Sequence, residues 1–471
     1  MITSLRVQNF KAWADTGVIR LAPITVFFGA NSSGKSSIQQ FLLMLKQTAE
    51  SPDRRRVFHA GGEGATPVAL GSFRDYVFGH DSSKEIDFSL SWRLPDPLKI
   101  EDPKKKNSTF HAAEMAFRSR VGQGERSGQL QVREFTYSPG GRDGQPLFSV
   151  SMQPAAGRPS QYSLTTEGYN LVATLGRKWQ LPSPVRYYGF PAEAVARYQN
   201  TEFVADLALA LERQLRLVTY LGPLREPPSR NYKWSGDAPE HVGWSGERTI
   251  DAILAASNRR LNRRPKAKKE AFQEIVARWL KRMGLIEKFE IVPLAPDSDV
   301  YEARVSAWHG TETVLLPDVG FGVSQVLPVI AECFYAQPHS TIVMEQPEIH
   351  LHPAVQSKLA DLFIETVRSG ERGSPRQIQV VVESHSEHFL RRLQRRIAEE
   401  EIEASEVALY FCDTGPSGAT LRPLDVDLFG NISNWPVDFF GDQMEDVVAQ
   451  AKSGLKRQRA AKAADRGPAS K

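Results

Sequence analysis

The chain has 471 residues, of which 41% are hydrophobic, and its formal net charge at pH 7 is only +4. A chain of this length can bury a large core in one or two folding units, and so small a charge does not identify a polyanionic partner. Its two cysteines, Cys333 and Cys412, lie far apart in sequence, which argues against a disulfide scaffold or a cysteine-based metal site. No apolar run is long enough to span a bilayer and the N-terminus lacks a signal-peptide core, so we expect a soluble, cytoplasmic protein with no membrane association.

Positive charge is concentrated in three short segments, at residues 258–269, 391–396 and 456–471. Any one of them is typical of a solvated helix face or a disordered end. Because there are three such segments, DNA stays a candidate partner.

The N-terminal part predicts strands, a glycine-rich loop and then a helix. Residues 4–10, 18–21 and 23–29 have strand character, and an apolar stripe at helical spacing runs from Ile38 to Leu45. Between residues 60 and 180, alternating segments separated by turn residues predict antiparallel β structure.

Helical periodicity then prevails over residues 203–221, 247–261 and 269–285, and beyond residue 300 helices and strands alternate. We expect buried strands at 340–346 and 377–385, with a helix between them that begins near Pro353. The helix after the second strand is expected to begin at Ser384, which stands in capping-box spacing with Glu387.

Residues 29–36, GANSSGKS, match the phosphate-loop pattern G-x-x-x-x-G-K-[ST]. Glycines allow the tight turn that directs backbone N–H groups at phosphate oxygens, and the following helix adds its positive end. We expect Lys35 to pair with the β- and γ-phosphates of ATP and the Ser36 hydroxyl to ligate Mg²⁺. The residues expected to bind the nucleotide at this loop are Gly29, Asn31, Ser32, Ser33, Gly34, Lys35, Ser36 and Ser37.

The segment TIVMEQPE, residues 341–348, predicts the strand that carries the magnesium-side carboxylate. If Glu345 were the catalytic base, the metal position before it would be Met344, which cannot hold a hard cation. We therefore assign Glu345, with Ser36, to the metal. Gln346 then occupies the position of the general base, and Glu348 is a second candidate for it.

Two further segments complete the predicted site. In DVGFGVSQVLP, residues 318–328, Gly320, Gly322 and Ser324 stand at a helix start, where phosphate can bind. In VVVESHSEHF, His385 ends a buried strand and is expected to contact the γ-phosphate. His350 and His352 lack cysteine partners, so we do not assign them to zinc.

Assembled in this order, the motifs resemble those of the ABC-type ATPases of the RecF and SMC group. The segments LRVQNFKAW, GFGVSQVLP, EQPEIHLHP, ESHSEHF, YLGPLREPPSR and GNISNWPVDFF are similar to those of bacterial predicted AAA-type ATPases related to the OLD (overcoming lysogenization defect) proteins. The resemblance implies an α/β fold, a P-loop NTPase with an ABC/SMC-type split ATPase head, an antiparallel β subdomain and a helical insertion.

The element pattern and the resemblance together divide the chain. We expect the first half of the head with the phosphate loop (1–60), a β-rich insertion (61–200), a helical insertion (201–300), the second half of the head (301–420), a C-terminal segment (421–450) and a basic, disordered tail (451–471).

The resemblance also implies a homodimer that traps two ATP molecules with Mg²⁺, each between the phosphate loop of one chain and Gly322 and Ser324 of the other. Arg225 is a candidate phosphate-side or interface cation, with a salt bridge to a nearby carboxylate as the alternative. By family analogy, the ATPase controls a partner effector, a nuclease or another toxic enzyme, in antiviral defence. A DNA-binding ATPase of repair or chromosome maintenance is the alternative.

The chain departs from the group's pattern at two places. Gln346 stands where a glutamate is usual, and we favour slow hydrolysis in which Gln346 positions water. Two alternatives remain: Glu348 acts as the base, or the site binds ATP with hardly any turnover. The OLD proteins carry a C-terminal Toprim nuclease, for which about 85 residues after His385 leave little room. We expect no intrinsic nuclease, with Asp413, Asp425 and Asp427 in turns.

Overall fold

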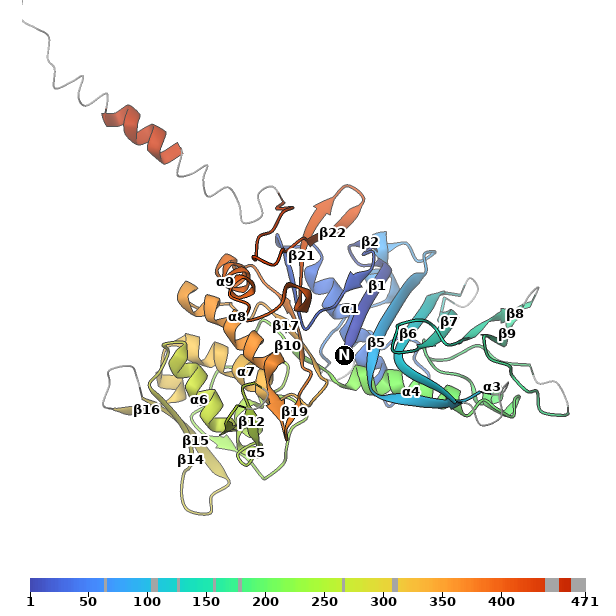
Figure 1. The fold of residues 1–471 in the computed structure, drawn as a ribbon, viewed down its shortest axis with the longest axis horizontal. Helices are drawn as coiled ribbons and strands as arrows, with labels where there is room; N and C mark the ends of the chain where they lie inside the picture. Colours follow the sequence, from blue (N-terminus) through green and yellow to red (C-terminus); the bar gives the residue numbers. More distant parts are fainter. Residues whose placement is uncertain are drawn as a thin grey trace, which may run out of the picture.

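The computed structural model describes residues 1–62, 66–102, 109–124, 128–155, 158–176, 180–264, 267–306, 312–436 and 449–458 (Figure 1). Two large sheets dominate the part of the chain that is described. One is a largely parallel sheet with the strand order β10-β17-β20-β4-β21-β22, and the other is antiparallel, with the order β2-β1-β5-β6-β7-β8-β9 and β3 beside β1.

The parallel sheet joins segments from both ends of the chain. Its strands are β4 (Ile24–Gly29), β10 (Val218–Leu221), β17 (Thr341–Glu345), β20 (Gln379–Glu383), β21 (Val407–Gly415) and β22 (Gly418–Leu424), of which only β22 is antiparallel to its neighbour. Successive residues of a strand enter opposite cores: Ile342 and Met344 join one hydrophobic cluster, and Val343 joins the other. Burial on both faces explains why these strands are continuous apolar runs in the sequence.

Helices cover both faces of this sheet. On one face lie α1 (Lys35–Glu50) and α4 (Phe203–Arg216). The cluster on the other face takes residues from α5 (Thr249–Ala255), α6 (Phe272–Arg282), α7 (Phe321–Tyr335), α8 (Pro353–Arg368) and α9 (Glu387–Ala398). None of the helices in the described residues has both the length and the apolar character that crossing a bilayer requires.

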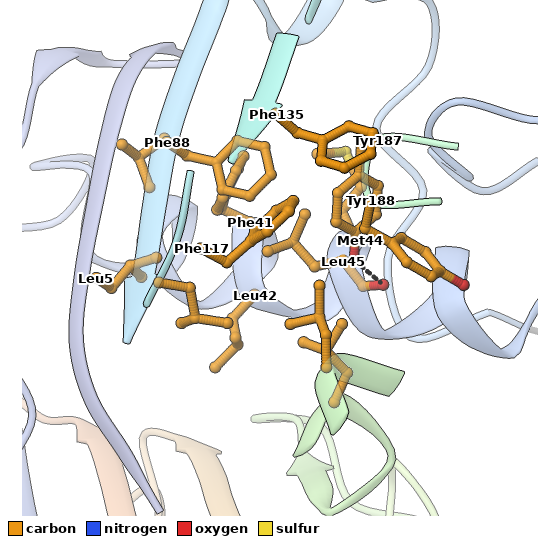
Figure 2. Packing of buried hydrophobic residues seen from close by; sticks show 14 of the residues in the cluster. Leu5, Phe41, Leu42, Met44, Leu45, Phe88, Phe117, Phe135, Tyr187 and Tyr188 are labelled. Carbon is orange, nitrogen blue, oxygen red and sulfur yellow. Dashed lines mark hydrogen bonds between the residues drawn. The ribbon is translucent and has the colours of Figure 1, made fainter. Parts of the chain in front are cut away.

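The antiparallel sheet anchors α1 from its other side. Its strands are β1 (Ile2–Phe10), β2 (Trp13–Asp15), β3 (Ile19–Arg20), β5 (Ile86–Glu101), β6 (Thr109–Gln123), β7 (Leu130–Gly140), β8 (Ser149–Ala155) and β9 (Arg158–Glu167). Figure 2 shows Phe41 of α1 among aromatic rings of this sheet; its ring centroid lies 5.0 Å from those of Phe10 and Phe88, in edge-to-face geometry. Because α1 is held between two sheets, the phosphate loop at its N-terminus has a rigid support.

Shorter elements complete the described fold. They are α2 (Phe73–Tyr76), η1 (Phe78–His80), α3 (Ala192–Ala196), β11 (Tyr232–Lys233), β12 (Arg260–Asn262), β13 (Lys269–Ala271), β14 (Lys288–Pro293), β15 (Val300–Ser306), β16 (Thr313–Leu315), η2 (Leu316–Asp318), β18 (Gly370–Glu371), β19 (Ser374–Pro375) and η3 (Ala404–Glu406).

The predicted fold class is confirmed. The glycine-rich loop follows β4 inside a parallel sheet, the chain returns to that sheet through β17, β20 and β21, and an antiparallel sheet and helices lie between the two halves. The head is therefore split in sequence and continuous in space.

Several local predictions are wrong. The helix expected over residues 203–221 ends at Arg216, and Val218–Leu221 form a strand of the parallel sheet, so the segment 201–300 is not simply helical. The strands of residues 1–20 belong to the antiparallel sheet with β5, so a boundary at residue 60 cuts through that sheet. In both cases the structure depends on which distant strand a segment pairs with, and local periodicity does not show this pairing.

Three corrections concern shorter segments. Helix α9 is capped by Ser386, whose hydroxyl accepts a hydrogen bond from the N–H of Phe389, and not by Ser384. Asp413 lies in β21 and not in a turn. Residues 449–458 are helical with exposed side chains, although a disordered tail is predicted from 451; residues 459–471 lie outside the described part.

Candidate functional site

The carboxyl ends of β4, β20 and β17 lie side by side, because these strands are parallel neighbours. Ligands of open α/β sheets bind at this edge. Here the glycine-rich loop borders a cavity of about 430 Å³, lined by Lys11, Ala12, Asn31, Ser32, Ser33, Gly34, Lys35, Ser36, Ser37, Gln40, Gln346 and Glu383. The structure thus brings Asn31 to Ser37 together with Gln346, about 310 residues further along the chain.

The loop closes tightly because two of its positions are glycine. Gly29 has φ +141°, and a Cβ there would lie 2.1 Å from the carbonyl oxygen of Cys412. Gly34 has φ +89°, and a Cβ would lie 3.1 Å from the ring of Trp13, whose Nε1–H donates to the Gly34 carbonyl at 3.0 Å. Only glycine fits such close backbone approach, which leaves the loop's inner side free for a ligand.

Lys35 and Ser36 both reach a carboxylate on β20. The Lys35 ammonium donates to the carbonyl oxygens of Gly29 and Ala30, at 3.1 and 2.6 Å, and lies 3.8 Å from Glu383 Oε1. The Ser36 hydroxyl donates to Glu383 Oε2 at 2.7 Å. Burial lowers the pKa of Lys35, with the Glu383 charge opposing it. This arrangement suits an anion at Lys35 and a hard cation between Ser36 and Glu383.

Glu345 lies on the strand next to the one that carries Glu383. It is in register with Glu383 on the neighbouring strand, and its Oε1 accepts a hydrogen bond of 2.9 Å from the hydroxyl of Tyr220. Burial, and then the nearby Glu383 charge, raise the pKa of Glu345 to about 7. The predicted metal pair of Ser36 and Glu345 is therefore not in direct contact, since the hydroxyl bonds to Glu383 instead.

The three predicted catalytic residues follow the ends of β17 and β20. Gln346 donates its backbone N–H to the Glu383 carbonyl at 2.9 Å and has φ +44°, a left-handed conformation that is strained for a residue with a Cβ. Glu348 Oε1 accepts the backbone N–H of His385 at 2.6 Å, and burial raises the pKa of Glu348. Burial also lowers the pKa of His385, which favours a neutral imidazole. Of the three, only Gln346 lines the cavity.

Gly320, Gly322 and Ser324 do not line this cavity within one chain. Gly320 precedes the first residue of α7, and the Ser324 hydroxyl donates to the carbonyl of Phe321 at 2.8 Å. Phe321 is 57% exposed, and its ring packs edge-on against His350. The start of the predicted signature segment, Gly320 and Phe321, thus lies on the surface, whereas Ser324 is buried.

Sequence analysis misses four residues of the cavity lining, Lys11, Ala12, Gln40 and Glu383. Glu383 ends a second buried strand, and that position is the signal that identifies it. Lys11, between β1 and β2, donates to Gln40 Oε1 at 2.6 Å. Only the sheet pairing brings Lys11 to the loop, so nothing in the local sequence points to it. In the described residues, no group of three or more His, Cys, Asp or Glu side chains has metal-site geometry.

The residues fit a nucleotide with Mg²⁺. The phosphate loop, Lys35 and Ser36 border one cavity with Glu383, and the buried Oε1 of Gln39, on α1, and Nε2 of His385 have no hydrogen-bond partner. Unsatisfied buried polar atoms of this kind indicate a missing ligand or water.

The family comparisons agree with this chemistry. A model described as "AAA ATPase domain" matches residues 1–115 and 247–390, and a model described as "Protein of unknown function (DUF3696)" matches residues 402–450. A comparison with curated proteins finds no match.

Solved structures of SMC head domains have a distant likeness to the chain. An SMC head bound to the C-terminal winged-helix domain of ScpA is 12% identical, with a TM-score of 0.42 and coverage of 90% of this chain and 98% of the other. The SMC head domain from Thermotoga maritima is 13% identical, with a TM-score of 0.40 and coverage of 90% and 99%. A Pyrococcus furiosus SMC head with an extended coiled coil, bound to the C-terminal domain of ScpA, is 11% identical, with a TM-score of 0.38 and coverage of 90% and 96%.

Because all three TM-scores lie below 0.5, the assignment stands on the family model and on the strand order of the chain itself. The "AAA ATPase domain" model covers more than half of the chain, in two segments that meet at the phosphate-loop cavity. The chain belongs to the AAA ATPase domain family.

Proposed function

We propose that this chain binds ATP with Mg²⁺ and hydrolyses it slowly. The observation that carries the proposal is the single cavity shared by the phosphate loop, Gln346 and Glu383. Lys35 and the loop N–H groups would hold the phosphates, and Ser36 and Glu383, with Glu345 beside them, would hold the metal. Mg²⁺, when bound, supplies positive charge that stabilises the transferred phosphoryl group.

Gln346 is the best-placed group to orient water. It is the one predicted catalytic residue that lines the cavity, whereas Glu348 is buried and its carboxylate accepts the backbone N–H of His385. An amide can position water and cannot accept its proton, so hydrolysis is slow. Glu348 is better suited to positioning His385 than to acting as a base.

The test compares ATP turnover of the wild-type chain with that of three variants. Gln346→Glu supplies a carboxylate base, and we expect turnover to rise about a hundredfold or more. Glu348→Ala should change turnover less than Lys35→Ala, which removes phosphate binding. Collapse of turnover in Glu348→Ala, with nucleotide affinity kept, would instead make Glu348 the base. Absence of nucleotide binding by the wild-type chain would end the proposal.

We further propose that two chains dimerise head to tail around the nucleotide. The surface position of Gly320 and Gly322, and the exposed Phe321 between them, supports contact with another chain. ATP-dependent dimerisation that is lost in Gly320→Arg, where an added side chain meets no atom of its own chain within 4 Å of its Cβ, would support this arrangement. A dimer that forms equally without nucleotide would contradict it.

The biological role that we favour is control of a partner effector, as in the OLD-related ATPases. The C-terminal segment supports a protein partner, because Leu428 and Phe429 are each 76% exposed there. DNA binding as a repair or maintenance clamp has less support. Arg263, Arg264 and Arg396, from two of the three basic segments, are all engaged in ion pairs. A shift in the electrophoretic mobility of DNA that depends on salt and is stimulated by ATP would reverse this preference.

A further inference from the structure

A second cavity lies away from the phosphate loop, between the antiparallel sheet and the β10 edge of the parallel sheet. Its volume is about 860 Å³, about twice that of the phosphate-loop cavity, and the two share no lining residue. Residues of α1, β5, α4 and β10 line it, and Figure 1 shows α4 running beside β5. Cavities of this size commonly hold small organic molecules.

Strand β5 leaves its regular pairing where it borders this cavity. Its register with β6 shifts between Arg93 and Leu98, where four residues of β5 stand opposite one residue of β6. Three of those four, Leu94, Pro95 and Asp96, line the cavity. A bulge of this kind bends a strand and is common beside functional sites.

Three buried side chains of the lining have a polar atom without a hydrogen-bond partner in the described part of the chain. They are Trp92, Gln214 and Thr219, with Nε1, Nε2 and Oγ1 unsatisfied. These residues are only 1%, 3% and 7% exposed, and they come from β5, α4 and β10. Unsatisfied polar atoms gathered from three elements around one cavity indicate a ligand that completes them.

Two of these three groups can only donate a hydrogen bond. The indole of Trp92 has a single N–H and no acceptor. The Gln214 amide oxygen already accepts from the Met1 ammonium at 3.2 Å, which leaves the amide NH₂ as its free end. The matching ligand therefore presents acceptor atoms, such as carbonyl oxygens or ring nitrogens.

The charges around the cavity do not favour a phosphate. Three cations and four carboxylates line it, and the buried Lys46 is paired with Glu50. Asp96, Asp206 and Glu240 are exposed, and in the described residues their carboxylates make no hydrogen bond or ion pair. Carboxylates accept hydrogen bonds from hydroxyl groups, including those of ribose.

We propose that this cavity is a second ligand site, which binds a neutral nucleoside. In this arrangement the base accepts hydrogen bonds from Trp92 and Gln214, and the sugar hydroxyls donate to the exposed carboxylates. Leu94, Leu98 and Leu217 supply apolar contacts for the base. The site needs neither the phosphate loop nor ATP, so it is independent of the proposed function.

The test is calorimetric titration of the full chain with adenosine, guanosine, cytidine and uridine, each up to about 1 mM. We expect at least one of them to bind with a Kd below about 1 mM. Ala210→Trp should abolish this binding, because Ala210 lines the cavity and the larger side chain fills it. The matched control is Ala205→Trp, at an exposed position of the same helix that does not line the cavity, and it should bind as the wild type does.

Two milder variants examine the donors one at a time. Trp92→Phe and Gln214→Leu each remove an N–H group and keep most of the side-chain volume. Each should weaken nucleoside binding about twofold to tenfold, the range for one lost hydrogen bond between neutral groups. Lys35→Ala should leave nucleoside affinity unchanged, since a nucleoside has no phosphate for the loop to hold.

Binding of none of the four nucleosides would overturn the inference, and so would undiminished binding by a folded Ala210→Trp chain. Loss of nucleoside binding in Lys35→Ala would place the nucleoside at the phosphate loop and would also contradict the proposal. If Ala210→Trp does not fold, the milder variants decide, because unchanged affinity in both Trp92→Phe and Gln214→Leu would exclude the cavity as the binding site.

Discussion

Two charged regions of this molecule differ in whether their arginines are paired with carboxylates. On the face covered by α8 and α9, the buried Asp361 accepts three arginines, with Arg396 at 2.6 Å, Arg392 at 3.0 Å and Arg282 at 3.5 Å. At the carboxyl edge of the parallel sheet, Arg225 is unpaired, although Glu345 lies near it. The first region ties helices together through ion pairs, and the second holds an arginine whose three guanidinium nitrogens make no hydrogen bond.

The difference shows why a count of basic residues is a poor guide to function. The segments 258–269 and 391–396 are the most basic in the described sequence, yet Arg263, Arg264 and Arg396 are used in ion pairs within the chain. Lys35, a single cation outside these segments, lines the candidate cavity and is 3.8 Å from Glu383. Charge density in the sequence therefore does not identify the cation of the site.

The largest effect is expected from breaking the paired region. Asp361→Ala removes the buried carboxylate that three partly exposed arginines share, and the free energy of unfolding should fall by about 3 kcal/mol, the upper range for hydrogen bonds to a charged group. Urea denaturation measures this loss. Nucleotide affinity of the folded variant should stay as in the wild type, and a large loss of affinity would contradict the separation of the two regions.

Lys35→Ala should have the opposite effect: nucleotide affinity should fall. Loss of its charge-assisted contacts with phosphate should weaken binding of an ATP analogue about a hundredfold. Calorimetric titration measures this change, and Lys46→Ala, a buried lysine on the same helix that pairs with Glu50, is the matched control. Equal affinity losses in both lysine variants would show that α1 had been disturbed as a whole.

Gln346→Gly should separate stability from activity, because it removes backbone strain and the side chain at the same position. Gln346 has φ +44°, which glycine adopts freely, so the free energy of unfolding should rise by up to about 1 kcal/mol. ATP turnover should fall, because the side chain that faces the cavity is gone. Gain of turnover would remove Gln346 from the proposed site.

The smallest effect is expected at an exposed pair. Arg118 bonds Asp87 at 2.6 Å on the antiparallel sheet and is 59% exposed, so Arg118→Ala should cost less than about 1 kcal/mol. High salt should shrink this cost further. A loss as large as that of Asp361→Ala would mean that exposure does not separate the two classes of ion pair.

Sequence analysis predicts what local patterns encode. The glycine-rich loop, the strand before it and the stripe of α1 are contiguous in the chain, so their geometry follows from spacing and residue type. The two buried strands that precede Gln346 and His385 are continuous apolar runs in the sequence, so they locate the rest of the candidate site approximately.

What sequence analysis misses depends on long-range pairing. Val218–Leu221 continue the apolar pattern of α4, and only their pairing with β17 makes them a strand. Glu383 stands one strand away from Glu345, and the hydrogen bond that selects it comes from Ser36, 347 positions earlier. Nor does the sequence show that Arg225 makes no hydrogen bond, since that depends on how the rest of the chain packs around it.

The most direct test of the account is the Mg²⁺ dependence of ATP-analogue binding in Glu383→Gln. The account predicts that Mg²⁺ strengthens binding by the wild-type chain and that this gain falls about tenfold or more in the variant, because a carboxylate on the metal side is lost. An undiminished gain from Mg²⁺ in Glu383→Gln, in a chain that still binds the analogue through Lys35, would contradict a pocket built jointly by the phosphate loop and the end of β20.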